Sequence, residues 1–312
     1  MKKLKIYTDI SGLQLSNPVL TTGTFDGIHR GHFSVLSHMK EKAALMGGES
    51  VVFTFWPHPR YVLQNSSGNL KLLNTLEEKK TLFERSGIDN LIIYPFTEDF
   101  ASLSSRDFIQ KILVEKIGVK HLVFGYDHQF GKNREGSFDS LKESSHEFGF
   151  SVEQVDALTI DGINISSTKI RHMLEAGEID LANKYLGYNY YMRGVVVSGM
   201  KLGRKIGFPT ANVSPDDDHK LIPPPGVYCV KVRVGNEEFA GMMNIGFRPT
   251  FGENNRETIE VHIIDFDREI YDNAIELWFV TKLRDEKKFD GIDALITQLK
   301  KDKEETIRIM SK

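Results

Sequence analysis

Two histidines three residues apart, His29 and His32, follow a short apolar stretch and a glycine-rich turn. The turn is expected to present unpaired backbone N–H groups at the start of the next helix, where proteins commonly bind phosphate. Gly23, Gly27 and Gly31 predict positive φ angles that bring the backbone close to a ligand. Two imidazoles on one face of the first helical turn suit the negative charge that builds on a nucleotide phosphorus during displacement by an oxygen. The stretch therefore predicts a phosphate site that needs no covalent nucleophile.

The string at residues 23–32, GTFDGIHRGH, is similar to the G-x-F-D-x-x-H-x-G-H signature of the HIGH-type nucleotidyltransferases. Its F-D-G-x-H-R-G-H form resembles the adenylyltransferase half of the prokaryotic bifunctional riboflavin kinase/FAD synthetases. The resemblance implies that His29 and His32 hold the ATP phosphates and stabilise the transition state, with Gly23, Phe25 and Asp26 at the nucleotide site. Without the surrounding string, an H-x-x-H pair would fit two surface histidines equally well.

The composition is that of an ordinary soluble globular protein, with 40% hydrophobic and 27% charged residues. The 312 residues favour two domains. The net charge of -3 argues against a nucleic-acid binder, because such domains carry a basic excess. A single cysteine, Cys229, permits no internal disulfide and indicates a reducing compartment. With no apolar run of about 18 residues and no signal peptide, the sequence predicts a cytoplasmic protein without a membrane segment.

Extended and helical patterns alternate through the first half of the chain. After the signature, strands are predicted at residues 50–55, 91–94, 121–124 and 151–155, with helices between them. Such alternation predicts an α/β domain whose parallel sheet is covered on both faces. Ligands then bind beyond the carboxyl ends of the strands, where the candidate motifs fall. We assign residues 1–187 to this Rossmann-like domain and residues 188–312 to a second domain.

A helix start at residues 165–171, ISSTKIR, adds a second candidate phosphate contact. Hydroxyl groups at a helix N-terminus can bind phosphate, and Arg171 lies one turn past Ser167, in position for bidentate bonds to a departing pyrophosphate. An ordinary capped helix would show the same pattern. The order of the signature, the F-x-P-H-P turn at 55–59, an F-G-x-D loop at 124–131 and this helix start matches the family.

The resemblance implies that Ser167, Thr168 and Arg171 hold the triphosphate and that Asp127 lies at the nucleotide site. One residue departs from the family pattern. His128 stands where the family more often has phenylalanine, which bears on the packing of that loop.

A strand, a glycine-containing basic loop and a second strand are predicted over residues 194–213. Such a loop can fold over phosphates. Thr210 and Asn212 point the same way in an extended chain, and their oxygens are ligands that magnesium accepts. A polar strand face after a solvated turn is the alternative. The loop residues assigned to the nucleotide are Gly199, Lys201, Gly203, Arg204 and Gly207.

Glu260 and His262 lie on the polar face of a later alternating stretch, opposite Ile259, Val261 and Ile263. Periodicity alone predicts that both polar side chains are solvated. A helix bearing apolar residues from 292 to 299 closes the chain.

The second half resembles the riboflavin kinase domain over nearly its whole length. The match rests on GRKIGFPTAN at 203–212, PGVY at 225–228, NIGFRPTF at 244–251, ETIEVH at 257–262 and LRDEKKF at 283–289. The resemblance implies a six-stranded antiparallel barrel of Greek-key type with a closing helix. It also implies that Thr210 and Asn212 bind Mg-ATP, that Glu260 takes the proton from the ribityl 5′-hydroxyl, and that Arg284 contacts the flavin.

The combined pattern predicts a bifunctional enzyme that uses magnesium and ATP. The C-terminal domain phosphorylates riboflavin to FMN, and the N-terminal domain transfers AMP from ATP to FMN, giving FAD and pyrophosphate. Three alternatives remain: an enzyme with only one active half, a flavin-binding carrier or regulator without chemistry, and transfer of CMP or AMP to a different small phosphate. The third leaves the second half unexplained. The sequence leaves the oligomeric state open.

Overall fold

The computed structural model describes residues 3–63, 70–126, 131, 136, 138–199, 202–248 and 256–311. The chain divides into two units, one made of Met1–Lys71 and Leu76–Ser166, the other of Leu72–Thr75 and Ser167–Lys312. Each unit is described by itself. The domain boundary expected after residue 187 stays a prediction.

Six strands of the first unit form one sheet in which every neighbouring pair is parallel, as the alternating pattern predicts. The order across the sheet is β1-β4-β3-β2-β5-β6. Its strands are β1 (Lys5–Tyr7), β2 (Val19–Thr22), β3 (Ser50–Trp56), β4 (Asn90–Pro95), β5 (His121–Gly125) and β6 (Ser151–Val155). The chain runs outward from β2 through β3 to β4 and then returns to β5 on the other side of β2. The carboxyl end of β2 is therefore at the switch point where such sheets bind ligands.

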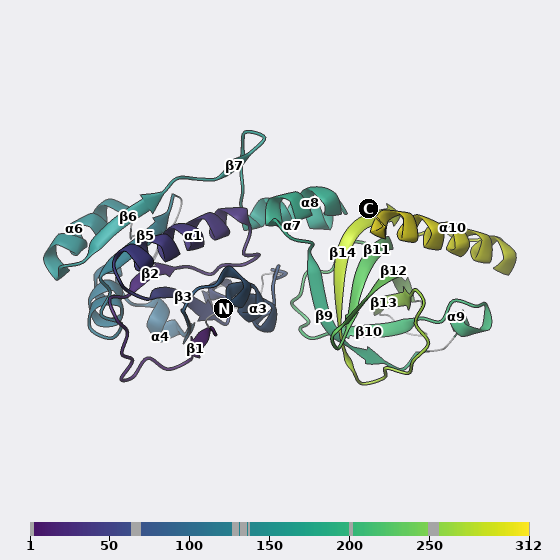
Figure 1. Cartoon of the computed structure of the whole chain (residues 1–312), viewed down its shortest axis with the longest axis horizontal. Helices are drawn as coiled ribbons and strands as arrows, with labels where there is room; N and C mark the ends of the chain where they lie inside the picture. The colour runs from purple at the N-terminus through teal and green to yellow at the C-terminus, as the bar shows by residue number, and fades with distance from the viewer. Residues whose placement is uncertain are drawn as a thin grey trace. The chain divides into compact units, whose positions relative to one another are not determined.

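Helices pack on both faces of this sheet. They are α1 (Arg30–Leu45), α2 (Pro59–Leu63), α3 (Leu76–Ser86), α4 (Glu98–Ala101), α5 (Ser105–Asp107), a π-helix η1 (Phe108–Val114) and α6 (Phe138–Phe148). Helix α1 contacts α3 and runs beside β2 and β5 (Figure 1), whereas α6 contacts η1. A small hairpin of β7 (Thr159–Ile160) and β8 (Ile163–Asn164) precedes the second unit.

The core of the first unit explains why its strands read as continuous apolar runs. Leu20, Val51, Phe53, Ile92 and Leu122 have no measurable exposure and belong to one cluster with the apolar side of η1. A strand buried on both faces needs no polar alternation. The strand that precedes the signature turn is therefore held rigidly in the middle of the sheet.

The second unit contains a closed antiparallel barrel in the order β10-β13-β12-β11-β14-β9. Its elements are α7 (Ser167–Glu175), α8 (Ile179–Leu186), β9 (Tyr191–Val197), α9 (Leu202–Lys205), β10 (Ala211–Pro215), β11 (Gly226–Val234), β12 (Glu237–Arg248), β13 (Arg256–Ile263), β14 (Ala274–Arg284) and α10 (Ile292–Met310). Strand β14 returns to lie beside β11, the first of three consecutive antiparallel strands, which is the Greek-key order. The predicted barrel and closing helix are thus confirmed.

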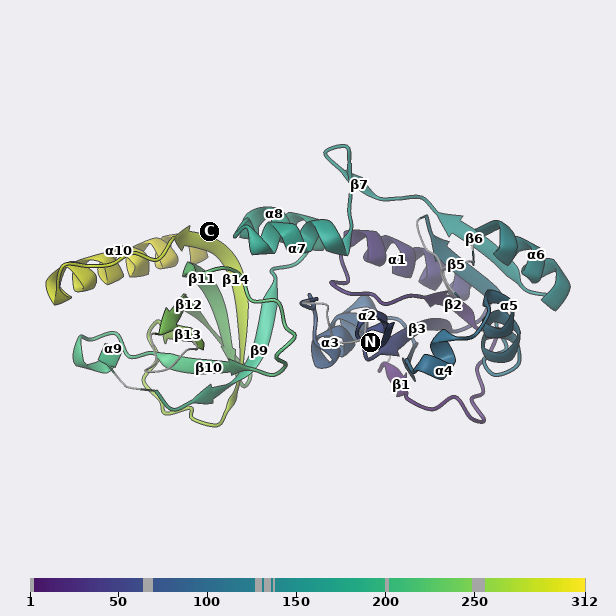
Figure 2. The same cartoon turned by 180° about the vertical axis from the view of Figure 1, so that it is seen from behind.

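Helix α10 covers the outside of β11 and β12 (Figure 2). For this reason Cys229, which the alternation of β11 places on a polar side, is fully buried. Burial raises the pKa of the Cys229 thiol to about 11, so the thiol stays neutral and unreactive near neutral pH.

The stretch at residues 187–191 is part of the packed second unit. Gly187 ends α8 in the left-handed conformation, with φ 85°, and Tyr190 and Tyr191 are fully buried. Under these rings lies Lys220, whose Nζ is 4.3 Å from the Tyr190 ring centroid and donates to the Leu73 carbonyl oxygen at 2.6 Å. These contacts place Leu72–Thr75 with the barrel.

Shortening a buried side chain in the central strand of the sheet should destabilise the first unit. Leu20 is fully buried and Leu45 is 84% exposed, so Leu20→Ala should lower the free energy of unfolding by about 2–5 kcal/mol and Leu45→Ala by less than about 0.5 kcal/mol. The chain has two tryptophans, Trp56 and Trp278. Urea unfolding in a Trp278→Phe background therefore reports the first unit through Trp56. Equal losses in the two variants would contradict the burial argument.

Candidate active sites

The signature turn leaves β2 and enters α1 with His29 as its N-cap residue. His29 Nδ1 accepts a hydrogen bond from the His32 backbone N–H at 3.3 Å. A ring nitrogen that accepts carries no proton, so neutral His29 carries its proton on Nε2 and presents that nitrogen as a donor. The two rings stack, with centroids 3.7 Å apart and planes 12° apart. A helix N-terminus with a fixed imidazole donor is suited to a phosphate oxygen.

Only part of the expected glycine geometry is present. Gly27 has φ 88°, but Gly23 and Gly31 are not in the left-handed region, so the prediction is wrong for these two. Gly31 supplies space instead, because a Cβ there would lie 3.2 Å from ring atoms of His29. The other left-handed residue of the turn is Phe25, with φ 47°.

Phe25 is held in this uncommon conformation by packing. Left-handed backbone costs a residue with a Cβ about 1–2 kcal/mol. The Phe25 ring is buried, 5.1 Å from the His32 ring and 5.5 Å from the Phe83 ring between centroids. Asp26 is also buried, with 1% exposure. The residues that the signature places at the nucleotide thus form one packed turn.

The hydroxyl–arginine cluster begins α7 as predicted. Ser167 and Thr168 are its first residues, and Arg171, one turn later on the face of Ser167, is only 9% exposed. These residues belong to the second unit, and their role with the triphosphate stays a prediction. Asp127, His128 and Lys201 lie outside the described residues.

In the barrel, three residues predicted from two separate motifs come together. Thr210 Oγ1 donates a hydrogen bond to Glu260 Oε2 at 3.2 Å. Asn212 on β10 is the direct cross-strand partner of Glu260 on β13. Since the Thr210 hydroxyl gives its proton to Glu260, its lone pairs remain for a cation. The arrangement can orient a carboxylate base and offer two oxygen ligands beside it.

The glycine loop before β10 leaves room for these side chains. A Cβ on Gly199 would lie 2.1 Å from Asn212 Nδ2, and one on Gly203 would lie 2.2 Å from the Phe208 carbonyl oxygen. Such approaches are too close for any side chain. Gly207, just after α9, has φ 82°. Three of the predicted loop glycines are therefore required by the local geometry.

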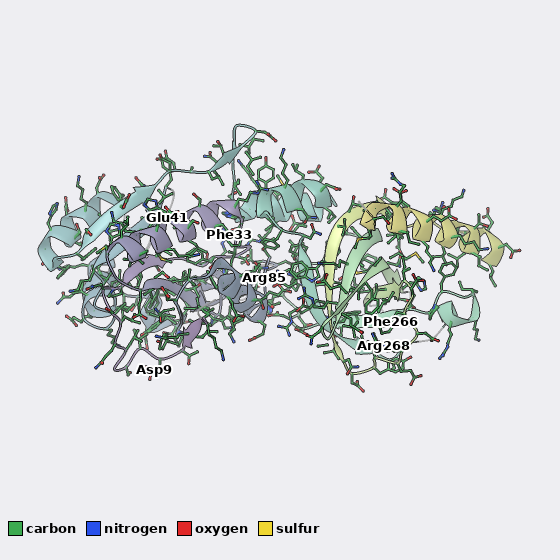
Figure 3. The ribbon with its side chains drawn as sticks, in the orientation of Figure 1. Asp9, Phe33, Glu41, Arg85, Phe266 and Arg268 are labelled. Atoms are coloured by element: carbon green, nitrogen blue, oxygen red, sulfur yellow. The ribbon has the colours of Figure 1, made fainter. Side chains whose placement is uncertain are left out.

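A cavity of ≈ 290 Å³ lies beside this cluster, lined by Arg204, Thr210 and Ala211 among others. Its far side is formed by the connection after β13, where Phe266 and Arg268 lie next to one another (Figure 3). The Arg268 guanidinium is 4.7 Å from the Phe266 ring centroid. The lining combines an aromatic wall, two arginines and two carboxylates, Asp267 and Glu269, which can meet the phosphates and the hydroxyl or amino groups of a nucleotide.

His262 is a residue whose position the periodicity misjudged. The expectation that it is solvated is wrong, because it is 7% exposed and its Nδ1 is 2.8 Å from the Pro209 carbonyl oxygen. Its ring packs on Phe208 at 5.3 Å between centroids, and burial lowers the pKa of His262. The side chain therefore fixes the backbone directly before Thr210. The sequence pattern of β13 does not show that the distant segment Phe208–Pro209 covers this side chain.

Arg284 ends β14 and forms a two-pronged ion pair with the buried carboxylate of Asp302 on α10, with Nη2 to Oδ2 at 2.8 Å. Its Nη1 donates to the Asp285 carbonyl oxygen at 3.1 Å. The guanidinium thus fastens the closing helix to the barrel. Its contact with flavin stays a prediction.

Among the residues that the structure describes, no group of three or more histidine, cysteine or acidic side chains is placed to hold a metal ion. Thr210 and Asn212 are a different kind of donor set. Magnesium bound to nucleotide phosphates takes only one or two ligands from the protein, and their oxygens fit that requirement. Over the described part of the chain, no helix combines the length and apolar character needed to cross a membrane.

A parallel-sheet unit with a histidine phosphate turn and a barrel with a threonine–asparagine–glutamate cluster define a two-domain enzyme of nucleotide and phosphoryl transfer. Comparison with protein families agrees: the FAD synthetase model matches residues 13–169, and the riboflavin kinase model matches residues 186–310. The chain belongs to the bifunctional riboflavin kinase/FMN adenylyltransferase family, whose reactions make FAD from riboflavin by way of FMN.

Two relatives illustrate the likeness. The bifunctional riboflavin kinase/FMN adenylyltransferase of Listeria monocytogenes is 41% identical over 306 residues, covering 98% of this chain and 95% of the relative. That of Bacillus subtilis is 39% identical, covering 94% and 92%. A solved structure from Streptococcus pneumoniae, described as a macrolide-efflux protein, has a TM-score of 0.88 at 30% identity and covers 97% of this chain and 98% of its own. It shares the fold of both units.

Adding a methyl group at Gly199 should impair the barrel site alone. The Cβ would displace the Asn212 amide, so Gly199→Ala should lower kcat/KM for riboflavin phosphorylation by at least about tenfold, since misplacement by about 1 Å can cost more than that. FAD formation from supplied FMN should change by less than twofold. Gly291→Ala is the matched control, because nothing lies within 4 Å of a Cβ there. An unaffected kinase in Gly199→Ala would contradict the assigned role of Asn212.

Acid should weaken the barrel through His262. Because burial lowers its folded-state pKa, the unfolded chain takes up a proton that the folded chain does not. The free energy of unfolding should be fully retained above the unfolded pKa of about 6.5 and fall as the pH drops below it. Urea unfolding in a Trp56→Phe background, followed by Trp278 fluorescence at several pH values, measures this. His262→Gln should flatten the dependence; an unchanged slope would assign it to other groups.

Proposed function

We propose that the two reactions of FAD synthesis are divided between the units, with riboflavin phosphorylated in the barrel and FMN adenylylated at the signature turn. The observation that carries this division is a separate cluster of chemically suited side chains in each unit. Thr210, Asn212 and Glu260 meet in the barrel, whereas His29 and His32 stack at the start of α1.

In the barrel, Glu260 removes the proton from the ribityl 5′-hydroxyl as that oxygen attacks the γ-phosphorus of ATP, and ADP leaves. The Thr210 hydroxyl, by donating to Glu260, orients the carboxylate. Thr210 and Asn212 would hold magnesium, which when bound with ATP neutralises charge on the transferred phosphoryl group. The loop with Gly203 and Arg204 covers the phosphates, and the adjoining cavity takes the rest of the nucleotide.

In the first unit, a phosphate oxygen of FMN attacks the α-phosphorus of ATP, and pyrophosphate leaves. The Nε2–H of His29 and the N-terminus of α1 stabilise negative charge on the phosphoryl oxygens. His32 holds the His29 ring in place through its backbone N–H and through the stacking of the two rings. Ser167, Thr168 and Arg171 would bind the departing pyrophosphate, and magnesium would accompany the nucleotide. The substrates ATP, riboflavin and FMN are the only partners that this function requires.

Incubation with riboflavin and Mg-ATP, followed by chromatographic separation of FMN and FAD, tests the division. His29→Ala should lower FAD formation by at least about 100-fold and leave FMN formation unchanged. Glu260→Gln should lower FMN formation by about 10²–10⁴-fold and leave FAD formation from supplied FMN unchanged.

Loss of both activities in either folded variant would show that the two-site assignment is wrong. Flavin retained by the wild-type protein without ATP turnover would instead identify a carrier. If only one product forms, one half is inactive. A matched control is His219→Ala, since His219 is exposed and lies outside both clusters.

A further inference from the structure

A lysine of the first unit is buried directly behind the signature turn. Lys79, in the first half of α3, is 1% exposed. Its Nζ donates a hydrogen bond to the Thr24 carbonyl oxygen at 2.9 Å and lies 5.5 Å from the centroid of the Trp56 ring. Trp56 ends β3 in the F-x-P-H-P turn, so one ammonium group joins two of the motifs that follow neighbouring strands. A helical lysine is normally solvated, since burying its charge is costly.

We propose that Lys79 is a positioning residue for adenylyl transfer, acting through the peptide that links Thr24 to Phe25. The proposal rests on the assignment of that reaction to the first unit. The Thr24 carbonyl oxygen receives a second hydrogen bond from Thr54 Oγ1 at 3.4 Å. In a trans peptide the N–H points away from the carbonyl, so fixing this oxygen toward α3 turns the Phe25 N–H toward the opposite side.

The Phe25 N–H finds no acceptor among the residues that the structure describes. Phe25 is only 4% exposed, and a buried amide without a partner is rare, so this N–H is a donor that a bound phosphate oxygen can meet. Phe25 lies in the left-handed region, and its ring contacts His32. The peptide that Lys79 holds therefore sets both the direction of an amide donor and the position of the ring that backs a signature histidine.

Helix α3 holds the turn at two points one helical turn apart. Lys79 binds the Thr24 carbonyl and Phe83, four residues later, contacts the Phe25 ring. Without the lysine bond, only the longer Thr54 hydrogen bond holds this carbonyl, so the peptide can rotate more freely while the rest of the helix stays packed. Rotation would withdraw the donor from developing charge, which affects the transition state more than the ground state.

Lys79→Met keeps the length of the side chain but removes the ammonium, and Lys79→Gln keeps a neutral donor. The matched control is Lys40→Met, because Lys40 Nζ donates to the Ser86 carbonyl oxygen at 2.6 Å, at the opposite end of α3. We measure kcat and KM for ATP in FAD formation from FMN, riboflavin kinase activity of the same samples, and melting of the first unit.

Lys79→Met should lower kcat for FAD formation by about 10- to 100-fold, less than the loss of a direct donor, with KM for ATP changed less than threefold and kinase activity unchanged. Lys79→Gln should keep at least three times the kcat of Lys79→Met, and Lys40→Met should stay within twofold of wild type. If Lys79→Met does not fold, Lys79→Gln is judged against wild type and Lys40→Met.

A kcat within threefold of wild type for Lys79→Met would overturn the proposal. So would an equal loss in Lys40→Met, which would assign the effect to helix packing, or a change in KM alone. A wild-type protein that forms no FAD would overturn the assignment of adenylyl transfer itself, and is thus distinguished from failure of the role of Lys79.

Discussion

One hydrogen bond, from the His32 backbone N–H to His29 Nδ1, joins the chemistry of the first unit to its backbone. The bond satisfies one of the N–H groups that every helix start leaves open. It also leaves His29 Nε2 as the protonated nitrogen, so that the cap selects the tautomer that can donate to a phosphate. Protonation of Nδ1 would end the cap. The neutral donor form and the start of α1 therefore stabilise one another.

In the barrel, the side chains of the site are held in position by strand register instead of by helix capping. Glu260 pairs with Asn212 on one side and Asn244 on the other. Since side chains alternate along a strand, a slip of one residue in either pair would turn the carboxylate to the opposite face. Closure of the barrel prevents such slips, because every strand has two neighbours. The fastening of α10 through Arg284 and Asp302 adds a cover on the outside.

The sequence predicts most of the fold, because local patterns determine most of it. The strands expected at 50–55 and 151–155 are found at residues 50–56 and 151–155. The sequence misjudges burial where a distant segment covers a side chain. Helix α10 covers Cys229, and His262 packs against the segment at Pro209, whose carbonyl oxygen its ring contacts. Lys79 escapes sequence reasoning for the same reason, since a lysine between polar neighbours on a helix predicts a solvated face. The cluster of Thr210, Asn212 and Glu260 was predicted through family motifs, but only the strand pairing shows how they meet.

The two sites differ in a way that their nucleophiles explain. The hydroxyl of riboflavin is a neutral alcohol that has to lose a proton as it attacks, so a carboxylate held by Thr210 is useful in the barrel. The phosphate of FMN is already ionised near neutral pH, with a second pKa of about 6, and needs no base. What limits its attack is repulsion between anions and charge on the phosphorus oxygens. In the proposed assignment, imidazole and amide donors at a helix N-terminus meet that need, which would account for histidines in one site and a glutamate in the other.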